Sequence, residues 1–140
     1  QQAFDIYRDR FEPSAQLQQP YAMLAANVLL ADSDAEARRQ FTSTQQGFIN
    51  LRRGKPGQVQ PPIDDIEAFW SPAEKAMVQH ALAISFVGTA TTVKDDLAEM
   101  VKTFAPDELI ITCNIFDQGA RLRSIELIAE SATALGFEQH

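Results

Sequence analysis

Residues 21–31 read YAMLAANVLLA, and this almost continuously apolar run decides the fold class. A strand that is covered on both faces in a parallel sheet has this composition. A buried helix could have it too, because composition alone does not separate the two. The tetrapeptide SDAE at 33–36 favours the strand, since it is a capping box that starts a helix directly after the run. The two segments together predict a βα unit.

The helix that begins at this capping box has apolar positions at alternating steps of four and three residues, which predicts one core-facing stripe. The stripe consists of Ala37, Phe41, Thr44, Phe48 and Leu51. Arg52, Arg53 and Gly54 should end the helix. Residues 55–70 contain four prolines or glycines within a short stretch and predict an excursion rather than a minimal connection. A second capping box at 71–74 opens a helix to about residue 84.

The remaining segments continue the alternation of helices and strands. Residues 1–11 form a helix, residues 86–88 are short and extended, and Thr91 or Thr92 caps a helix that runs to residue 104. Residues 108–113 are the second strong strand, and a final helix starts at Asp117 with apolar positions at Leu122, Ile125, Leu127, Ile128 and Leu135. This order predicts a helix-rich α/β fold with parallel strands, as in barrels and doubly wound sheets. A complete flavodoxin-like domain is disfavoured, because only two convincing strands are present and about five are needed.

Composition narrows the class of protein. The chain has 140 residues, 45% of them hydrophobic, which predicts a single domain over 1–140. A complete β/α barrel needs roughly 250 residues, so we expect an incomplete domain. The net charge of -7 disfavours nucleic acid and anionic membranes as partners. One cysteine and no leader or transmembrane pattern predict a cytoplasmic protein. The first residue is not Met and no capping residue precedes the first helix, which indicates a piece of a longer chain.

Chemistry in parallel α/β folds gathers where strands end and helices begin. After the first strand, Asp32, Ser33 and Asp34 are expected to cap the following helix, because no glycine there lets a phosphate approach. After the last strong strand, Asn114, Asp117, Arg121 and Ser124 could face a pocket. The alternative is that Asp117 caps the helix and pairs with Arg121.

The other reactive residue types favour structural roles. Cys113 is expected to be a small buried hydrophobe, because a nucleophile needs a base nearby and the two histidines, His80 and His140, lie elsewhere in the sequence. No Cys/His spacing fits a metal site, and no glycine-rich phosphate loop occurs. The catalytic and cofactor-binding residues therefore stay unknown at this point.

Many ordered motifs of the chain resemble one known family. They are Tyr7-Arg8, Phe11, Pro13-Ser14, Leu17, residues 20–23, Ala31-Asp32, residues 45–54, Pro61-Pro62, residues 69–72, Val87-Gly88, residues 107–109, residues 115–117, Arg121-Leu122 and Ser124. Over nearly its whole length the chain resembles the C-terminal part of luciferase-like flavin-dependent monooxygenases, the relatives of the bacterial luciferase subunits.

The resemblance implies a fold and an activity. The fold would be the last two β/α units of a (β/α)8 TIM barrel, with residues 21–31 as the seventh strand, residues 108–113 as the eighth, and the excursion near the mobile lid of luciferases. The parent enzyme, an oxidoreductase, would use reduced FMN and O2 to oxygenate a small organic substrate such as an aldehyde. The motifs favour FMN but leave a deazaflavin open as the alternative. A flavin reductase would be its partner.

The family's catalytic histidine and most of its flavin-phosphate contacts lie in earlier strands, so the resemblance assigns no catalytic residue here. Asn114, Asp117 and Arg121 are the candidates for shaping the mouth of the active site. This chain alone is expected to be inactive. The alternative is a non-catalytic half barrel that acts as an oligomerisation or partner-binding module, because open sheet edges must be paired or covered. In either case we expect a homo-oligomer or association with the missing N-terminal part.

Overall fold

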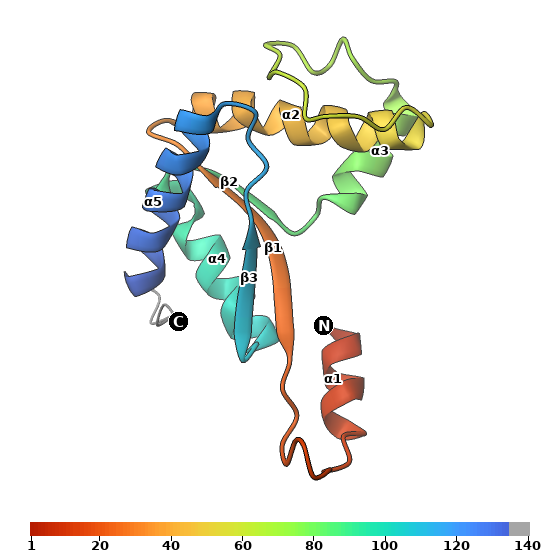
Figure 1. Cartoon of the computed structure of the whole chain (residues 1–140), viewed down its shortest axis with the longest axis vertical. Coiled ribbons are helices and arrows are strands. Elements are labelled where there is room, and N and C mark those ends of the chain that lie inside the picture. The colour runs from red at the N-terminus through yellow and green to blue at the C-terminus, as the bar shows by residue number, and fades with distance from the viewer. Residues whose placement is uncertain (135–140) are drawn as a thin grey trace.

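The computed structural model describes residues 1–134, with side chains described through residue 131 (Figure 1). Leu135 and His140 lie outside the described residues. The elements in chain order are α1 (Gln2–Asp9), β1 (Met23–Leu30), α2 (Asp34–Arg52), α3 (Pro72–Ala81), β2 (Ser85–Gly88), α4 (Ala90–Phe104), β3 (Glu108–Thr112) and α5 (Gln118–Ala134). The alternation of helices and strands expected from the sequence is therefore present.

The three strands form one parallel sheet in the order β2-β1-β3. Strand β1 lies in the centre and pairs with β3 along its first half, from Met23 opposite Glu108 to Asn27 opposite Thr112. Its second half pairs with β2, from Asn27 opposite Ser85 onward. The expectation of two convincing strands was thus incomplete. Strand β2 has only four residues, too few for a hydrophobic pattern to separate a strand from an extended connection.

Helices cover one face of the sheet and leave much of the other open. On the covered face, alternate residues of β1 pack against α4, and α1 and α5 add partly buried side chains. The buried members of this core are Leu24, Ala26, Val28, Leu30, Val93, Leu97 and Met100. On the other face, α2 crosses the carboxyl end of the sheet and forms a second core of Leu29, Ala37 and Ile115. Strand β1 is thus buried on both faces only in its last residues.

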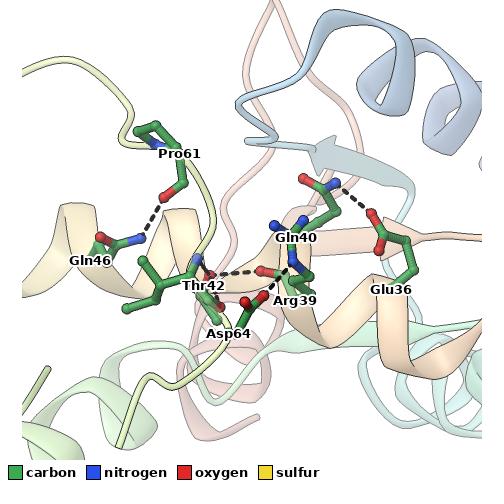
Figure 2. Close-up of polar contacts among 8 residues, drawn as sticks. Glu36, Arg39, Gln40, Thr42, Gln46, Pro61 and Asp64 are labelled. Atoms are coloured by element: carbon green, nitrogen blue, oxygen red, sulfur yellow. Dashed lines mark hydrogen bonds and ion pairs between the residues drawn. The ribbon is translucent and has the colours of Figure 1, made fainter. Parts of the chain in front are cut away.

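Helix α2 does not bury the stripe that its sequence predicts. Of that stripe Ala37 is buried, Phe41, Thr44 and Phe48 are half-buried, and Leu51 is 56% exposed. The buried positions are mostly polar instead: Gln40, Thr42, Ser43, Gln46 and Ile49. The reason is that the proline-rich excursion folds back along α2 and bonds its polar side chains, which periodicity of apolar residues cannot reveal (Figure 2).

Three polar contacts attach residues 61–64, in the middle of the excursion, to α2, and Figure 2 shows them together. The backbone N–H of Ile63 donates to Thr42 Oγ1 at 2.9 Å. Gln46 Nε2 donates to the carbonyl oxygen of Pro61 at 2.9 Å. Arg39 Nε donates to Asp64 Oδ1 at 2.7 Å. The side-chain groups thus replace the backbone partners that an irregular segment lacks.

The helix boundaries differ from the sequence expectation in two places. Thr89, not Thr91 or Thr92, is the N-cap of α4, and its side chain accepts a hydrogen bond from the backbone N–H of Thr92. The helix starts earlier because β2 ends at Gly88, where Asp34 also reaches across to the new helix. Helix α3 ends at Ala81 rather than near residue 84, because the chain must extend to pair as β2 from residue 85. The capping box that begins α3 is present as expected.

Candidate functional site on the open face of the sheet

Three polar side chains, one from each strand, form a hydrogen-bonded row across the open face of the sheet. Thr112 Oγ1 donates to Asn27 Oδ1 at 2.7 Å. Asn27 Nδ2 in turn donates to Ser85 Oγ at 3.1 Å. The strand register creates this row, because Asn27 lies opposite both Ser85 and Thr112. We call these three residues the polar row.

Apolar side chains flank the polar row on the same face, since alternate residues of a strand share a face. Toward the amino ends of the strands lie Ala25 and Ile110, followed by Met23. Ile110 is 41% exposed and Met23 is 54% exposed, values that are high for large apolar side chains. Toward the carboxyl ends, Leu29 and Val87 lie under α2. The open face is therefore an apolar surface with one band of neutral hydrogen-bonding groups.

Of the residues after β1, only Ser33 caps α2 as predicted, and Asp32 and Asp34 bond to other helices instead. Ser33 Oγ accepts from the backbone N–H of Glu36 and caps α2. Asp34 Oδ1 accepts from Thr92 Oγ1 at 2.6 Å and from the backbone N–H of Thr89 at 2.8 Å, and these bonds lower the pKa of Asp34. Asp32 pairs with Arg123 of α5 at 2.9 Å. The first strand end thus joins α2, α4 and α5.

The three mouth candidates follow β3 and are exposed, and no bond between their side chains occurs among the contacts of the described residues. The backbone N–H of Arg121 donates to the carbonyl oxygen of Asp117 at 3.0 Å. Asp117 Oδ1 accepts from the backbone N–H of Ala120, so Asp117 caps the start of α5 as one interpretation predicted. The guanidinium of Arg121 donates through Nη2 to Gln118 Oε1 at 2.7 Å rather than to the carboxylate of Asp117. The carbonyl oxygen of Asn114 accepts from Thr44 of α2. All three lie at the carboxyl end of the sheet, beyond the polar row.

A fully buried serine connects the two principal strands at this end. Ser124 of α5 has no exposed surface, and its Oγ accepts from the backbone N–H of Leu30 at 2.9 Å. Cys113 Sγ donates to the same oxygen at 3.3 Å. Burial raises the pKa of the Cys113 thiol, although the bond with Ser124 and the charge of Arg121 act in the opposite direction. Cys113 is half-buried and has little thiolate at neutral pH, which agrees with a structural role.

The basic end of α2 is occupied by contacts within the chain. Arg53 forms two hydrogen bonds to the carboxylate of Glu74, donates to the carbonyl oxygen of Phe69, and lies 5.1 Å from the centre of that ring. The guanidinium and the capping bonds from Ser71 together lower the pKa of Glu74 to about 2. Arg53 therefore holds the excursion against α3 and is not a free anion-binding group.

A cavity of about 940 Å³ lies beside the polar row, between α2, α3, α4 and the free edge of β2. Ser85 belongs to both features, because it is part of the cavity lining. The lining also contains apolar side chains, among them Phe41 and Phe86, and the ion pair between Arg39 and Asp64. Its volume is within the range of small-molecule sites.

The described His, Cys, Asp and Glu residues do not gather in threes around a point that could hold a metal ion. Across residues 1–134, every helix is too short or too polar to span a membrane.

Comparison with known proteins identifies relatives over nearly the whole chain. A luciferase-like monooxygenase of Escherichia coli K12 is 46% identical over 126 residues, and YvbT, an uncharacterized protein of Bacillus subtilis, is 41% identical over 128 residues. This chain is a relative of the luciferase-like monooxygenases. The match covers 90% and 91% of this chain, respectively, but only 38% of either relative, so the chain spans under two fifths of their length.

A solved structure supports the same relationship. The crystal structure of apo-MsnO8 matches with a TM-score of 0.70 and 27% sequence identity, covering 94% of this chain and 41% of that one. No family model matches the chain. The family resemblance of the sequence motifs is thus confirmed by luciferase-like relatives that are much longer than this chain.

The polar row was missed in the sequence. Asn27 stood out only as an interruption of the apolar run 21–31, and Ser85 and Thr112 carried no signal of their own. A polar residue in the middle of a buried strand was the available clue, because such a residue needs hydrogen-bonding partners. Those partners come from strands 58 and 85 residues away in the sequence.

Proposed function

We propose that this chain is the C-terminal part of a flavin-dependent monooxygenase whose complete form is a (β/α)8 barrel. The observation that carries the proposal is the sheet with one helix-covered face and one open face, in a relative of luciferase-like monooxygenases. Strands β1 and β3, which the resemblance assigns to neighbouring places, are parallel hydrogen-bonded neighbours. The open face would line the interior of the barrel, which the missing strands would close.

The complete protein would use reduced FMN and O2 to oxygenate a small organic substrate. Bound reduced flavin would supply the electrons that activate O2. The open face would meet the flavin ring or the organic substrate only toward the carboxyl ends of the strands, near the neutral hydrogen-bonding groups of Asn27 and Thr112, because the barrel interior below that end is packed with side chains. It does not fit the phosphate, since the charged side chain placed on this face by the register is the acidic Glu108. The phosphate would then be held by residues outside this chain.

The residues of this chain would bind and enclose rather than react. Asn114, Asp117 and Arg121 lie where the carboxyl ends of the strands would open, and would shape the mouth of the site. The apolar face would exclude water from the interior. A flavin reductase would be the partner that supplies reduced FMN. Because this chain lacks most of the strands of the proposed barrel, it would be inactive alone.

Complementation tests the proposal. This chain is coexpressed with the portion of the Escherichia coli relative that the match leaves uncovered, and the copurified complex is assayed for binding of reduced FMN and for consumption of O2 with a panel of aldehydes. We expect binding and turnover by the complex and neither by the isolated chain. A stable complex that fails to bind FMN would refute the assignment to a flavin enzyme.

A second candidate function follows from the exposed apolar face, which favours an interaction module. Met23 and Ile110 are large, apolar and exposed, and β2 and β3 each pair on one side only. Such surfaces and edges promote association. Light scattering should give a mass above the 15.5 kDa of one chain, and the double variant M23K/I110K should lower it. A monodisperse monomer of the unaltered chain would contradict both the module and the half barrel.

A further inference from the structure

The amino half of β1 has a neighbouring strand on one side only. Strand β3 pairs with β1 from Met23 onward, whereas β2 pairs with it only from Asn27 onward. In a parallel sheet, the backbone groups of alternate residues point to the same neighbouring strand. On the β2 side, the N–H of Asn27 donates to the carbonyl oxygen of Ile84, and the N–H of Ala31 donates to that of Gly88. The odd-numbered residues of this segment therefore point toward the β2 side.

Two of these odd-numbered residues, Met23 and Ala25, precede the stretch that β2 covers. Their two N–H groups and two carbonyl oxygens face outward on the β2 side, and no hydrogen bond of these four groups occurs among the contacts of the described residues. Both residues are exposed. A row of free N–H and C=O groups is a template for pairing with another strand. We call the backbone edge of Met23 and Ala25 the edge slot.

The edge slot is closed at both ends. At its amino end, the Tyr7 hydroxyl of α1 accepts from the backbone N–H of Tyr21 at 3.2 Å and donates to the carbonyl oxygen of the same residue at 3.4 Å. Tyr7 thereby takes the place that a strand residue would occupy beside Tyr21. At the carboxyl end, Ile84 and β2 occupy the edge from Asn27 onward. Figure 1 shows α1 beside the lower half of β1, on the side away from β3.

The spacing of the free groups determines the length of the strand that fits. In parallel pairing, Met23 and Ala25 would each bond to the two residues that flank the residue directly opposite. The two opposite residues and their flanking residues make a strand of about five residues. A longer strand would meet Tyr7 at one end or β2 at the other, unless it turned away from the sheet.

Both faces of the incoming strand must be apolar. Its residues opposite Met23 and Ala25 would lie on the open face, because directly opposite residues share a face, and Ile110 is the next apolar residue there. Its other residues would lie on the covered face, beside the buried side chains of Leu24 and Ala26. A charged residue at either face would be buried without a counter-charge. A short, continuously apolar run meets these conditions, as in other strands of parallel sheets.

We propose that the edge slot binds a parallel strand of about five apolar residues from the portion of the protein outside this chain. The relatives favour this occupant, because this chain spans only 38% of their length and the remainder is long enough to supply further strands. A second copy of this chain is disfavoured, since the apolar strands of its described residues are already paired in its own sheet. This assignment rests on the proposed function for the parallel direction and deepens it by naming the partner.

Amide hydrogen exchange tests the edge slot in the complex of the full chain with the uncovered portion of the Escherichia coli relative. In the isolated chain, the amides of Met23 and Ala25 should exchange fast, whereas those of Leu24 and Ala26, which point to β3, should exchange slowly. In the complex, exchange at Met23 and Ala25 should slow by at least about 100-fold. Unchanged exchange at these two amides, or failure of the two portions to form a complex, would overturn the assignment. Protection in the isolated chain that rises with its concentration would identify a second copy as the occupant and would also overturn it.

A proline variant tests the slot by affinity. A25P removes the free N–H and places a ring in the slot, yet should leave the sheet of the isolated chain intact, because proline is tolerated where a strand N–H has no partner. A25S is the matched control, because it keeps the N–H. A25P should weaken the complex at least about tenfold relative to A25S. Equal affinities of the two folded variants would overturn the assignment, and if A25P does not fold, the exchange measurement on the unaltered chain decides.

Neither measurement uses a flavin, so the edge slot fails separately from the proposed function. Protection of Met23 and Ala25 in a complex that does not bind FMN would leave the strand site standing and refute the flavin enzyme. FMN binding and turnover by a complex without this protection would refute the edge slot alone.

Discussion

Replacing Ser124 by alanine should destabilise the carboxyl end of the sheet. Ser124 is fully buried, and its Oγ accepts the backbone N–H of Leu30 at 2.9 Å and the thiol of Cys113 at 3.3 Å. One oxygen therefore connects α5, the last residue of β1 and the residue after β3. Alanine keeps the helix but leaves the N–H of Leu30 buried without an acceptor.

The cost can be estimated from the groups involved. A buried backbone donor that loses its partner destabilises the folded state by about 1–3 kcal/mol. Alanine has a higher helix propensity than serine, which offsets about 0.5 kcal/mol of this. We therefore expect the free energy of unfolding to fall by about 1–2 kcal/mol. The bond from Cys113 adds little, because a thiol is a weak donor.

Urea denaturation followed by circular dichroism measures this change. With a slope of about 2 kcal/mol per molar urea, the midpoint should fall by about 0.5–1 M. Amide hydrogen exchange should also accelerate at Leu30 more than at its neighbours in β1. S131A is the matched control, because Ser131 lies on the same helix and its Oγ donates to the carbonyl oxygen of Leu127 within that helix. If S124A and S131A give equal midpoints, or if exchange at Leu30 is unchanged, the reasoning fails.

Three further predictions concern packing, pH and reactivity. G88A should lower the melting temperature by several degrees, because a Cβ at residue 88 would lie 2.7 Å from Thr92 Oγ1 and 2.8 Å from Asp34 Oδ1. G57A is the control and should leave the melting temperature unchanged, because a Cβ at residue 57 meets no atom within 4 Å. Equal melting temperatures of the two variants would contradict the close contact at Gly88. The pKa of Glu74 is lowered to about 2, so the stabilising contribution of its carboxylate is complete above pH 4.5, the unfolded pKa, and is lost as the pH falls through about 2. E74Q should remove this acid dependence of stability, which the fluorescence of Trp70 can measure during unfolding. An identical acid dependence in E74Q would refute the assignment. Cys113, with a raised pKa, should react with iodoacetamide at pH 7.5 more slowly than free cysteine, and an equal or faster rate would count against its burial.

Local sequence signals predicted much of the fold. The capping sequences at Ser33 and Ser71 mark the starts of α2 and α3, because a side-chain cap and the helix it begins lie within four residues. The full capping box forms at Ser71, whereas at Ser33 only the serine caps the helix, since Glu36 accepts from Gln40. Strands β1 and β3 were predicted from their apolar runs, although only the last residues of β1 are buried on both faces and β3 is half-buried at most. The start of α4 was misplaced by two or three residues, since three threonines within residues 89–92 offered competing caps and the end of β2 decided between them.

The candidate site was predicted only in its location at the strand ends. Asn114, Asp117 and Arg121 do lie there, but the ion pair between Asp117 and Arg121 expected under the capping interpretation is replaced by a bond from Arg121 to Gln118. Gln118 competes because it is one residue closer and lies on the adjacent helical position. The role of these residues at the mouth of an active site remains a prediction for the complete protein.

The sequence by itself determined the βα alternation, the acidic composition and the relationship to longer luciferase-like proteins, because these depend on local patterns and on motif order. Only the tertiary structure decided which face of α2 is buried and which residues meet on the open face. Both depend on strand register and on the return of a distant segment, as when Asn27 meets Thr112 from β3 and Thr42 meets Ile63. Contacts between residues far apart in a chain leave no periodic trace in it, and so the polar row became visible only once the strands were paired.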